Sequence, residues 1–111
     1  MRINEIINEA AVGTILTKNL EIVVDDHALE RAQERGVHPP AVDYIIRKQL
    51  PKVIHKLEKI ELGEKFWVYD WSTETSLGLR RISSTHLKFV LKTVYYGKAS
   101  KTPGIEKVIQ T

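Results

Sequence analysis

The chain contains no cysteine among its 111 residues. Disulfide bonds and thiolate metal sites are therefore excluded, and the composition fits a reducing compartment such as the cytoplasm. No apolar run approaches the roughly 20 residues that a membrane-spanning helix needs. Glu5 and Glu9 interrupt the N-terminus where a signal peptide would need an unbroken apolar stretch. We therefore expect a cytoplasmic protein that does not engage a membrane.

Several signatures of catalysis and ligand binding are also missing. The sequence has no glycine-rich phosphate loop, no GxSxG motif and no pair of carboxylates at catalytic spacing. Its four histidines show no short spacing such as HxxxH or HxH, which metal sites commonly use. We therefore expect no metal ion and no cofactor.

Charge is unevenly distributed along the chain. Residues 1–79 contain 10 Lys and Arg against 13 Asp and Glu, a net charge of −3. Residues 80–111 contain 7 Lys and Arg and a single acidic residue, Glu106, a net charge of +6. Such asymmetry favours a polyanionic partner, of which nucleic acid is the commonest. Lysines that guard a solvated edge strand would produce the same pattern.

The first half of the sequence shows helical patterns. Residues 1–19 are read as an N-terminal extension that forms a short helix over 2–11 or stays mobile, and residues 20–111 as one domain. Residues 20–24 read as a buried strand, and Asp25 or Asp26 can cap the helix expected over 27–35, which Gly36 ends. A second helix is expected over 40–49, with Pro51 closing it. Its inward-facing residues are expected to be Val42, Ile45, Ile46 and Gln49.

The second half shows alternating patterns typical of strands. Strands are expected over 53–62, 65–71, 77–82, 87–96 and 105–110. The order is then a short strand, two helices and an antiparallel sheet of four to five strands. Helices segregated from an antiparallel sheet define the α+β class.

The most informative pattern is the spacing of His27, Arg31 and Arg35, at i, i+4 and i+8 of the first helix. These side chains share one helical face, because each step of four residues drifts by only about 40°. Arginine binds phosphate through its planar fork, and histidine transfers protons near neutral pH. Metal-free RNA cleavage uses both. A solvated face with salt bridges would show the same spacing.

Further candidates lie in the basic C-terminal part. Arg80 and Arg81 are adjacent in a strand and therefore point to opposite faces, so one of them can join a site. Thr93, Tyr95 and Tyr96 end the longest expected strand, where hydroxyl groups can bind phosphate and tyrosine can stack on a base. Lys92 and Lys98 flank this segment in the sequence and are further candidates for binding the substrate. One expected strand is rich in aromatic residues: Phe66, Trp67, Tyr69 and Trp71. These rings form either a platform on which bases stack or part of the core.

The stretch HALERAQERGVHPPAVDYI resembles the opening of small phage and bacterial domains in the barnase–EndoU–colicin–RelE group of ribonuclease-like folds. The segments GEKFWVYD, LGLRRIS and FVLKTVYYGK look like the sheet of that group. The resemblance implies metal-independent RNA cleavage or RNA binding, with His27 as acid or base and Arg31 and Arg35 binding or stabilising phosphate. It also implies Arg81 and Thr93 as site residues on strands, with Tyr95 nearby.

Three functions are consistent with these patterns. The first is a ribonuclease-like enzyme, of the kind encoded by phages as toxins or effectors, acting on RNA and held by an antitoxin or virion protein. The second is an accessory module that binds nucleic acid or protein without chemistry. The third is a structural protein that buries residues 66–71 in a dimer.

Overall fold

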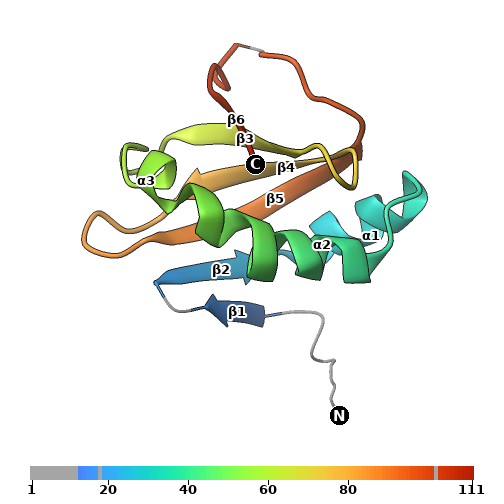
Figure 1. Ribbon diagram of the computed structural model, residues 1–111, viewed down its shortest axis with the longest axis horizontal. Coiled ribbons are helices and arrows are strands. Elements are labelled where there is room, and N and C mark those ends of the chain that lie inside the picture. Colours follow the sequence, from blue (N-terminus) through green and yellow to red (C-terminus); the bar gives the residue numbers. More distant parts are fainter. Residues whose placement is uncertain (1–12, 18, 102) are drawn as a thin grey trace.

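The computed structural model describes residues 13–17, 19–101 and 103–111. It is an α+β fold, as predicted, built on one six-stranded sheet with the order β1-β2-β5-β4-β3-β6 (Figure 1). The sheet is mixed, because β2–β5 and β3–β6 are parallel pairs; the expectation of an antiparallel sheet of four to five strands was wrong in this detail. The strands are β1 (Gly13–Thr17), β2 (Leu20–Val24), β3 (Lys65–Asp70), β4 (Thr75–Arg81), β5 (Lys88–Tyr96) and β6 (Val108–Gln110).

The first strand lies inside the segment that the sequence analysis set apart as an extension. β1 pairs antiparallel with β2, from Gly13 opposite Val24 to Thr17 opposite Leu20. The helix predicted over 2–11 lies outside the described residues. The predicted strand over 20–24 is confirmed as β2, whose alternate residues are buried.

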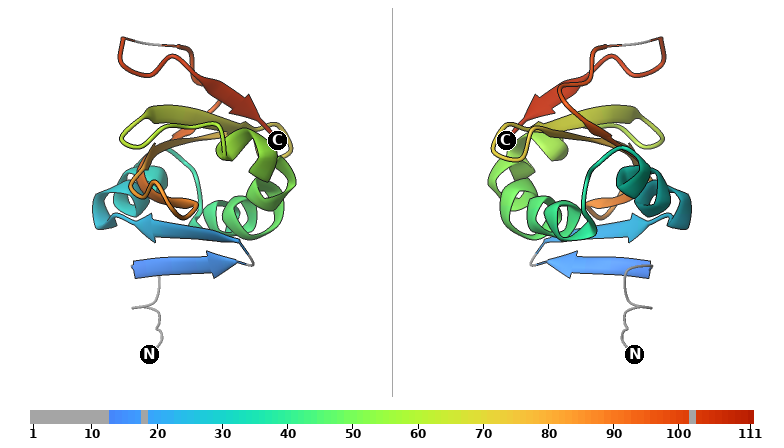
Figure 2. Two further views of the ribbon diagram at one scale, coloured as in Figure 1. Left: turned by 90° about the vertical axis from the view of Figure 1, so that its left-hand side faces the viewer. Right: turned by 90° about the vertical axis from the view of Figure 1, so that its right-hand side faces the viewer.

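The helix α1 (Asp26–Glu34) follows β2 directly. Asp25 caps it by accepting a hydrogen bond from the backbone N–H of His27, at 2.8 Å. Ala28 and Ala32 are fully buried. β2 pairs with β5 only as far as Leu91, and α1 packs alongside the rest of β5. Figure 2 shows α1 and the second helical layer on opposite sides of the molecule.

The second helical layer is one continuous path of different helix types. It runs from α2 (Pro39–Tyr44) through a π-helical turn at Ile45–Gln49 and a 3-10 turn at Leu50–Val53 to α3 (Ile54–Leu57). The prediction that Pro51 closes this helix was wrong. A 3-10 turn that starts one residue earlier accommodates the proline near its first position, where a missing N–H costs little. The preceding π turn changes the backbone register.

The strand predicted over 53–62 was also wrong, because the chain there is helical and then turns. Val53, Leu57 and Ile60 are buried, and their spacing of four and three residues is helical. The four inward-facing residues predicted for the second helix are confirmed as buried: Val42, Ile45, Ile46 and Gln49. This layer crosses one face of the sheet (Figure 1).

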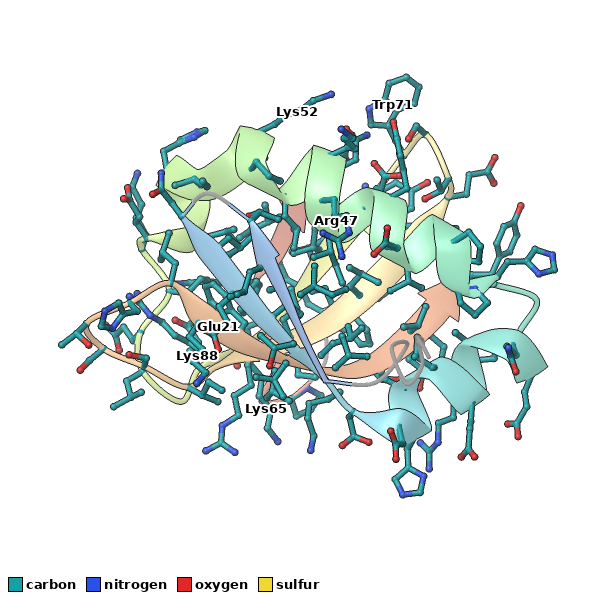
Figure 3. The ribbon with its side chains drawn as sticks, turned by 90° about the horizontal axis from the view of Figure 1, so that it is seen from below. Glu21, Arg47, Lys52, Lys65, Trp71 and Lys88 are labelled. Carbon is teal, nitrogen blue, oxygen red and sulfur yellow. The ribbon has the colours of Figure 1, made fainter. Side chains whose placement is uncertain are left out.

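The sheet therefore has two unlike faces. The face toward α2 and α3 carries the core, whose largest members on the strands are Ile22, Phe66, Val68, Leu77, Leu79, Phe89 and Leu91. The opposite face, called the outer face below, carries the alternate residues of the three central strands: Lys65, Trp67, Tyr69, Ser76, Gly78, Arg80, Lys88, Val90, Thr93 and Tyr95. A shift in the register of β4 and β5 leaves Lys92, which precedes Thr93, without a partner on β4. Figure 3 shows Lys65 on the side away from Lys52 and Arg47 of the helical layer.

A buried carboxylate ties the end of β3 to the last residue of the chain. Asp70 is fully buried and accepts hydrogen bonds from five donors: Gln49 Nε2, Ser72 Oγ, Thr73 N, Thr73 Oγ1 and Thr111 Oγ1. Burial acts to raise the pKa of this carboxyl, but the hydrogen bonds outweigh it and the pKa is lowered. Within the described residues, no helix has the length and apolar character to cross a membrane.

Candidate nucleic-acid interface

The predicted stripe of α1 divides into two exposed residues and one anchored residue. The His27 side chain is 79% exposed, and its Nδ1 lies 3.5 Å from Glu30 Oε1. Arg31 is exposed, and its guanidinium forms no hydrogen bond or ion pair with any residue that the structure describes. Arg35 is half-buried and reaches β5, so the stripe passes from open solvent onto the outer face.

Arg35 is fixed by three residues of β5. Its Nη1 donates to Thr93 Oγ1 at 3.1 Å and to the backbone oxygen of Val94 at 3.0 Å. Its guanidinium carbon lies 3.8 Å from the ring centroid of Tyr95. Among the described residues, none accepts from Nε or Nη2. A guanidinium has five N–H donors in a fixed plane, so this arginine is immobilised with donors left for a ligand.

The aromatic contacts continue from Tyr95 across the sheet. The rings of Tyr95 and Trp67 meet edge to face, with centroids 5.5 Å apart. Gly78 lies beneath Trp67 in the strand between them. A Cβ at Gly78 would lie 2.5 Å from Thr93 Cγ2 and 3.1 Å from Trp67 Cζ3, so only glycine leaves room for both side chains.

Trp67 is nearly covered, at 6% exposure, yet its indole N–H has no acceptor among the described residues. Buried donors without a partner are rare, because each loses its bond to water. Trp67 lines a hollow of about 350 Å³, called the aromatic hollow below. The other residues around it are Tyr95, Tyr96, Gly97, Lys98, Ala99 and Ser100.

The loop that forms one wall of the aromatic hollow is tied to β4. Ser76 Oγ donates to the backbone oxygen of Gly97 at 2.6 Å and accepts from the backbone N–H of Ala99 at 2.9 Å. This places the ammonium of Lys98 5.8 Å from the ring centroid of Tyr69. Cations therefore lie against aromatic rings on both sides of Ser76, at Tyr69 of β3 and at Tyr95 of β5.

Other predicted cations are more loosely placed. Lys92 Nζ lies 3.7 Å from Asp25 Oδ2, which places this lysine beside the start of α1. Arg80 is exposed on the outer face, opposite Lys65 in the register of β3 and β4. Lys88 is paired with Glu21 at 3.3 Å (Figure 3). Arg80 and Lys65 thus extend the basic character of the outer face beyond Trp67.

Arg81 is not brought together with Arg35. Arg81 lies on the face of Leu77 and Leu79, and there its guanidinium donates to four backbone oxygens. These belong to Ile60 at 2.6 Å, Ser83 at 2.7 Å, His86 at 3.3 Å and Glu58 at 3.4 Å. With its donors directed at main-chain carbonyls, Arg81 holds the turn after α3 against the 83–86 turn.

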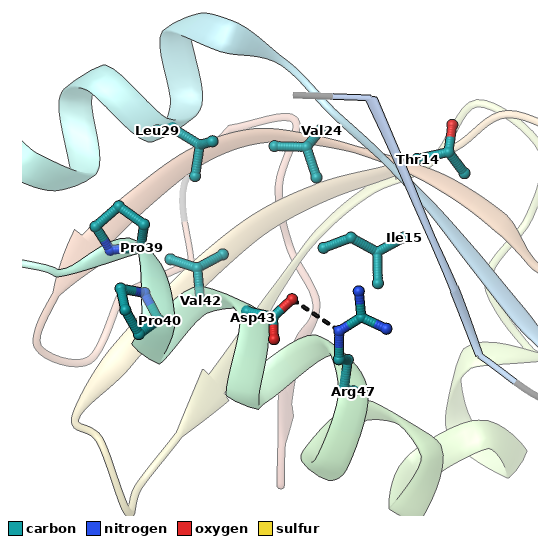
Figure 4. Close-up of a pocket in the computed structure, with 9 residues that line it drawn as sticks. All are labelled: Thr14, Ile15, Val24, Leu29, Pro39, Pro40, Val42, Asp43 and Arg47. Atoms are coloured by element: carbon teal, nitrogen blue, oxygen red, sulfur yellow. Dashed lines mark hydrogen bonds and ion pairs between the residues drawn. The ribbon is translucent and has the colours of Figure 1, made fainter. Parts of the chain in front are cut away.

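A further pocket, of about 450 Å³, lies between β1, α1 and α2 (Figure 4). Its walls are mainly apolar, from Ile15, Val24, Leu29 and Val42, and an ion pair at its wall joins Arg47 Nε to Asp43 Oδ1 at 2.8 Å. It contains none of the predicted site residues. Across the described part of the chain, no three His, Asp or Glu side chains gather in a way that could hold a metal ion.

Arg35, Thr93 and Tyr95 were predicted from the sequence and do meet in the structure, whereas Gly78 and Ser76 were not predicted. The available signal for Gly78 was its position inside the apolar strand pattern LGL, since glycine within a strand often marks a close approach. Ser76 had no such signal, because its role depends on a loop 21 residues further along the chain.

Comparison of the chain with family models, with curated proteins and with solved structures finds no match. The ribonuclease-like resemblance therefore depends on the residues quoted in the sequence analysis.

Proposed function

We propose that this domain binds RNA on its outer face, as a member of the ribonuclease-like group that its first helix resembles. The observation that carries the proposal is the placement of Arg35: a guanidinium lying over Tyr95, fixed by Thr93, with Nε and Nη2 left to donate. Proteins that bind single strands combine cations for the backbone with aromatic rings for the bases. This face provides both.

The proposed roles follow from these contacts. Arg35 and Arg31 bind phosphate, Thr93 positions Arg35, and Tyr95 presents a ring edge or face to a base. Lys92, Lys98 and Arg80 add positive charge around them. The indole N–H of Trp67 would gain an acceptor if a base or phosphate oxygen reached it.

For cleavage, we propose His27 as the group that transfers a proton. A base removes the proton of the 2′-hydroxyl, the resulting oxygen attacks phosphorus, and an acid protonates the departing 5′-oxygen. Among the described residues, Glu30 is the only one whose carboxylate lies within 4 Å of an imidazole nitrogen of His27. Tyr96 does not supply the base at neutral pH, because Glu74 beside it raises the pKa of its phenol and keeps the phenol protonated.

RNA binding without cleavage is the second candidate, and the surroundings of His27 favour it. His27 is 79% exposed, and its partner Glu30 sits on the same helix three residues away. Two groups on one exposed helical face are poorly placed to act on opposite sides of a phosphorus atom. In this case the domain would bind RNA through the same cations and aromatic rings, with no proton transfer at His27.

The two candidates are separated by incubating the protein with structured RNA in the presence of EDTA. An enzyme cleaves under these conditions, and the His27→Ala variant loses at least a hundredfold in rate, in line with the roughly 10² to 10⁴ that general acid–base catalysis contributes. The matched control is His55→Ala, which removes another exposed histidine, in α3. Equal cleavage by both variants contradicts catalysis by His27. Retention of RNA without cleavage supports the binding module.

A further inference from the structure

Two more hollows adjoin the aromatic hollow and lead around the β6 edge of the sheet. The second hollow, of about 480 Å³, is lined by Lys98, Ala99, Ser100, Lys101, Val108 and Gln110. It shares residues 98–100 with the aromatic hollow. The third, of about 330 Å³, shares Lys101 and Val108 with the second. Successive hollows therefore lie next to one another, and the three together are called the track below.

The third hollow is strongly basic. Four lysines line it, Lys56, Lys59, Lys101 and Lys107, against one carboxylate, Glu106. Lys107 is compensated by Glu64, since Lys107 Nζ lies 3.1 Å from Glu64 Oε2. Among the residues that the structure describes, none forms an ion pair with the other three lysines. Ammonium groups gathered around one hollow repel each other, and a bound anion would relieve that repulsion.

Protection of a sheet edge explains only part of this cluster. β6 is an edge strand, and lysines close to an edge strand discourage pairing with another chain. Lys101 and Lys107 precede β6 and fit that role. Lys56 lies in α3 and Lys59 in the turn that follows, so neither belongs to the edge. Their presence at the same hollow needs a different explanation.

We infer that a single-stranded RNA held at Tyr95 continues along this track, with its phosphates at Lys101, Lys56 and Lys59. The inference rests on the proposed function, because the track begins at the aromatic hollow. Neighbouring strands lie about 4.8 Å apart, so β6 is roughly 14 Å from β5 and the third hollow lies at the far end. A short oligonucleotide stops before it, and a longer one reaches it. Lysine recognises the charge of phosphate and not the base, so this second contact is independent of sequence.

The test compares two RNA lengths and three variants. Fluorescein-labelled uridine trinucleotide and dodecanucleotide are titrated with each protein across a range of NaCl concentrations, and binding is followed by anisotropy. The variant Lys56→Gln/Lys59→Gln removes two cations of the third hollow. The matched control Lys48→Gln/Lys52→Gln removes two exposed lysines of the same helical layer that line none of the hollows. Tyr95→Ala alters the start of the track.

The Lys56→Gln/Lys59→Gln variant is expected to bind the dodecanucleotide about 2- to 30-fold more weakly, with unchanged affinity for the trinucleotide. Its salt slope for the dodecanucleotide is expected to fall by about 1.4, because each phosphate contact with a single strand contributes about 0.7. The control keeps both affinities, and Tyr95→Ala weakens both oligomers.

Two outcomes overturn the inference in distinguishable ways. If the two lysine variants affect the dodecanucleotide equally while Tyr95→Ala still weakens both oligomers, the track is wrong and RNA binding at Tyr95 stands. If the unaltered protein retains neither oligomer, or Tyr95→Ala changes nothing, the proposed function fails and the track fails with it.

Discussion

Substitution of Gly78 by alanine tests whether the outer face is packed as tightly as its geometry indicates. The new methyl carbon would lie 2.5 Å from Thr93 Cγ2 and 3.1 Å from Trp67 Cζ3. Both separations are below the roughly 3.5–4.0 Å at which carbon atoms attract. Thr93 cannot simply turn away, because rotation about its χ1 would also move the hydroxyl that holds Arg35.

The expected cost of Gly78→Ala is about 1–3 kcal/mol of unfolding free energy, the usual range for overpacking. For a domain of this size, each kcal/mol corresponds to roughly 4 °C in melting temperature. Urea denaturation followed by circular dichroism measures the loss. Binding of RNA is expected to weaken as well, because Arg35 loses its position.

The variant Thr93→Ser provides an internal control. Serine lacks the Cγ2 methyl group that the new alanine would strike, and it keeps the oxygen that accepts from Arg35. The double variant Gly78→Ala/Thr93→Ser is therefore expected to be more stable than Gly78→Ala, with a coupling of about 0.5–3 kcal/mol. A fully stable Gly78→Ala protein, or the absence of any coupling, would refute the described packing.

Three further predictions concern separate parts of the molecule. Asp70→Asn is expected to lower the unfolding free energy by about 1–3 kcal/mol at neutral pH, as measured by urea denaturation. The reason is that the new amide N–H₂ is a donor and would lie against side chains that also donate at this position. The pKa of Asp70 is lowered in the folded state, so the ionised carboxylate stabilises the fold above the unfolded-state pKa, and this stabilisation is lost as the pH falls through the folded-state pKa. The difference in unfolding free energy between the unaltered protein and Asp70→Asn is therefore expected to decrease in acid. A difference that stays constant with pH would contradict this. Arg81→Lys is expected to lower the unfolding free energy by about 1–3 kcal/mol, because the ammonium of lysine cannot donate to all four backbone oxygens. RNA affinity is expected to stay unchanged. Weaker RNA binding by the folded variant would place Arg81 in the binding site. Tyr95→Ala is expected to weaken RNA binding about 5- to 150-fold in anisotropy titrations, whereas Tyr95→Phe keeps the ring and most of the affinity; equal losses would assign the effect to the hydroxyl.

The elements with clear local signals were predictable from the sequence. Asp25 before α1 and Gly36 after it are strong capping residues, and the structure shows Asp25 accepting a bond and Gly36 at a φ of +82°. The long alternating run near the C-terminus became β5. These features are determined by residues close together in the chain, so the local sequence pattern is enough to predict them.

Features that depend on distant contacts were not predictable. The helical path through Pro51 is stabilised by the burial of Val53 and Leu57 against the sheet, which outweighs the usual effect of a proline. The parallel pairing of β2 with β5 joins residues more than 60 positions apart. The role of Arg81 likewise depends on carbonyls from two turns that the sequence does not place side by side.

The central claim, that RNA binds the outer face at Tyr95 and Trp67, is tested most directly by the two indole N–H signals in a ¹H–¹⁵N NMR spectrum. Trp67 lies in the aromatic hollow at 6% exposure, with an indole N–H that lacks an acceptor among the described residues, whereas Trp71 is 62% exposed in the turn after β3. The Trp71→Phe variant assigns the two signals. Titration with single-stranded RNA is expected to shift the Trp67 signal and leave that of Trp71 in place. A shift of Trp71 alone, or no shift of either signal at saturating RNA, would contradict binding at this face.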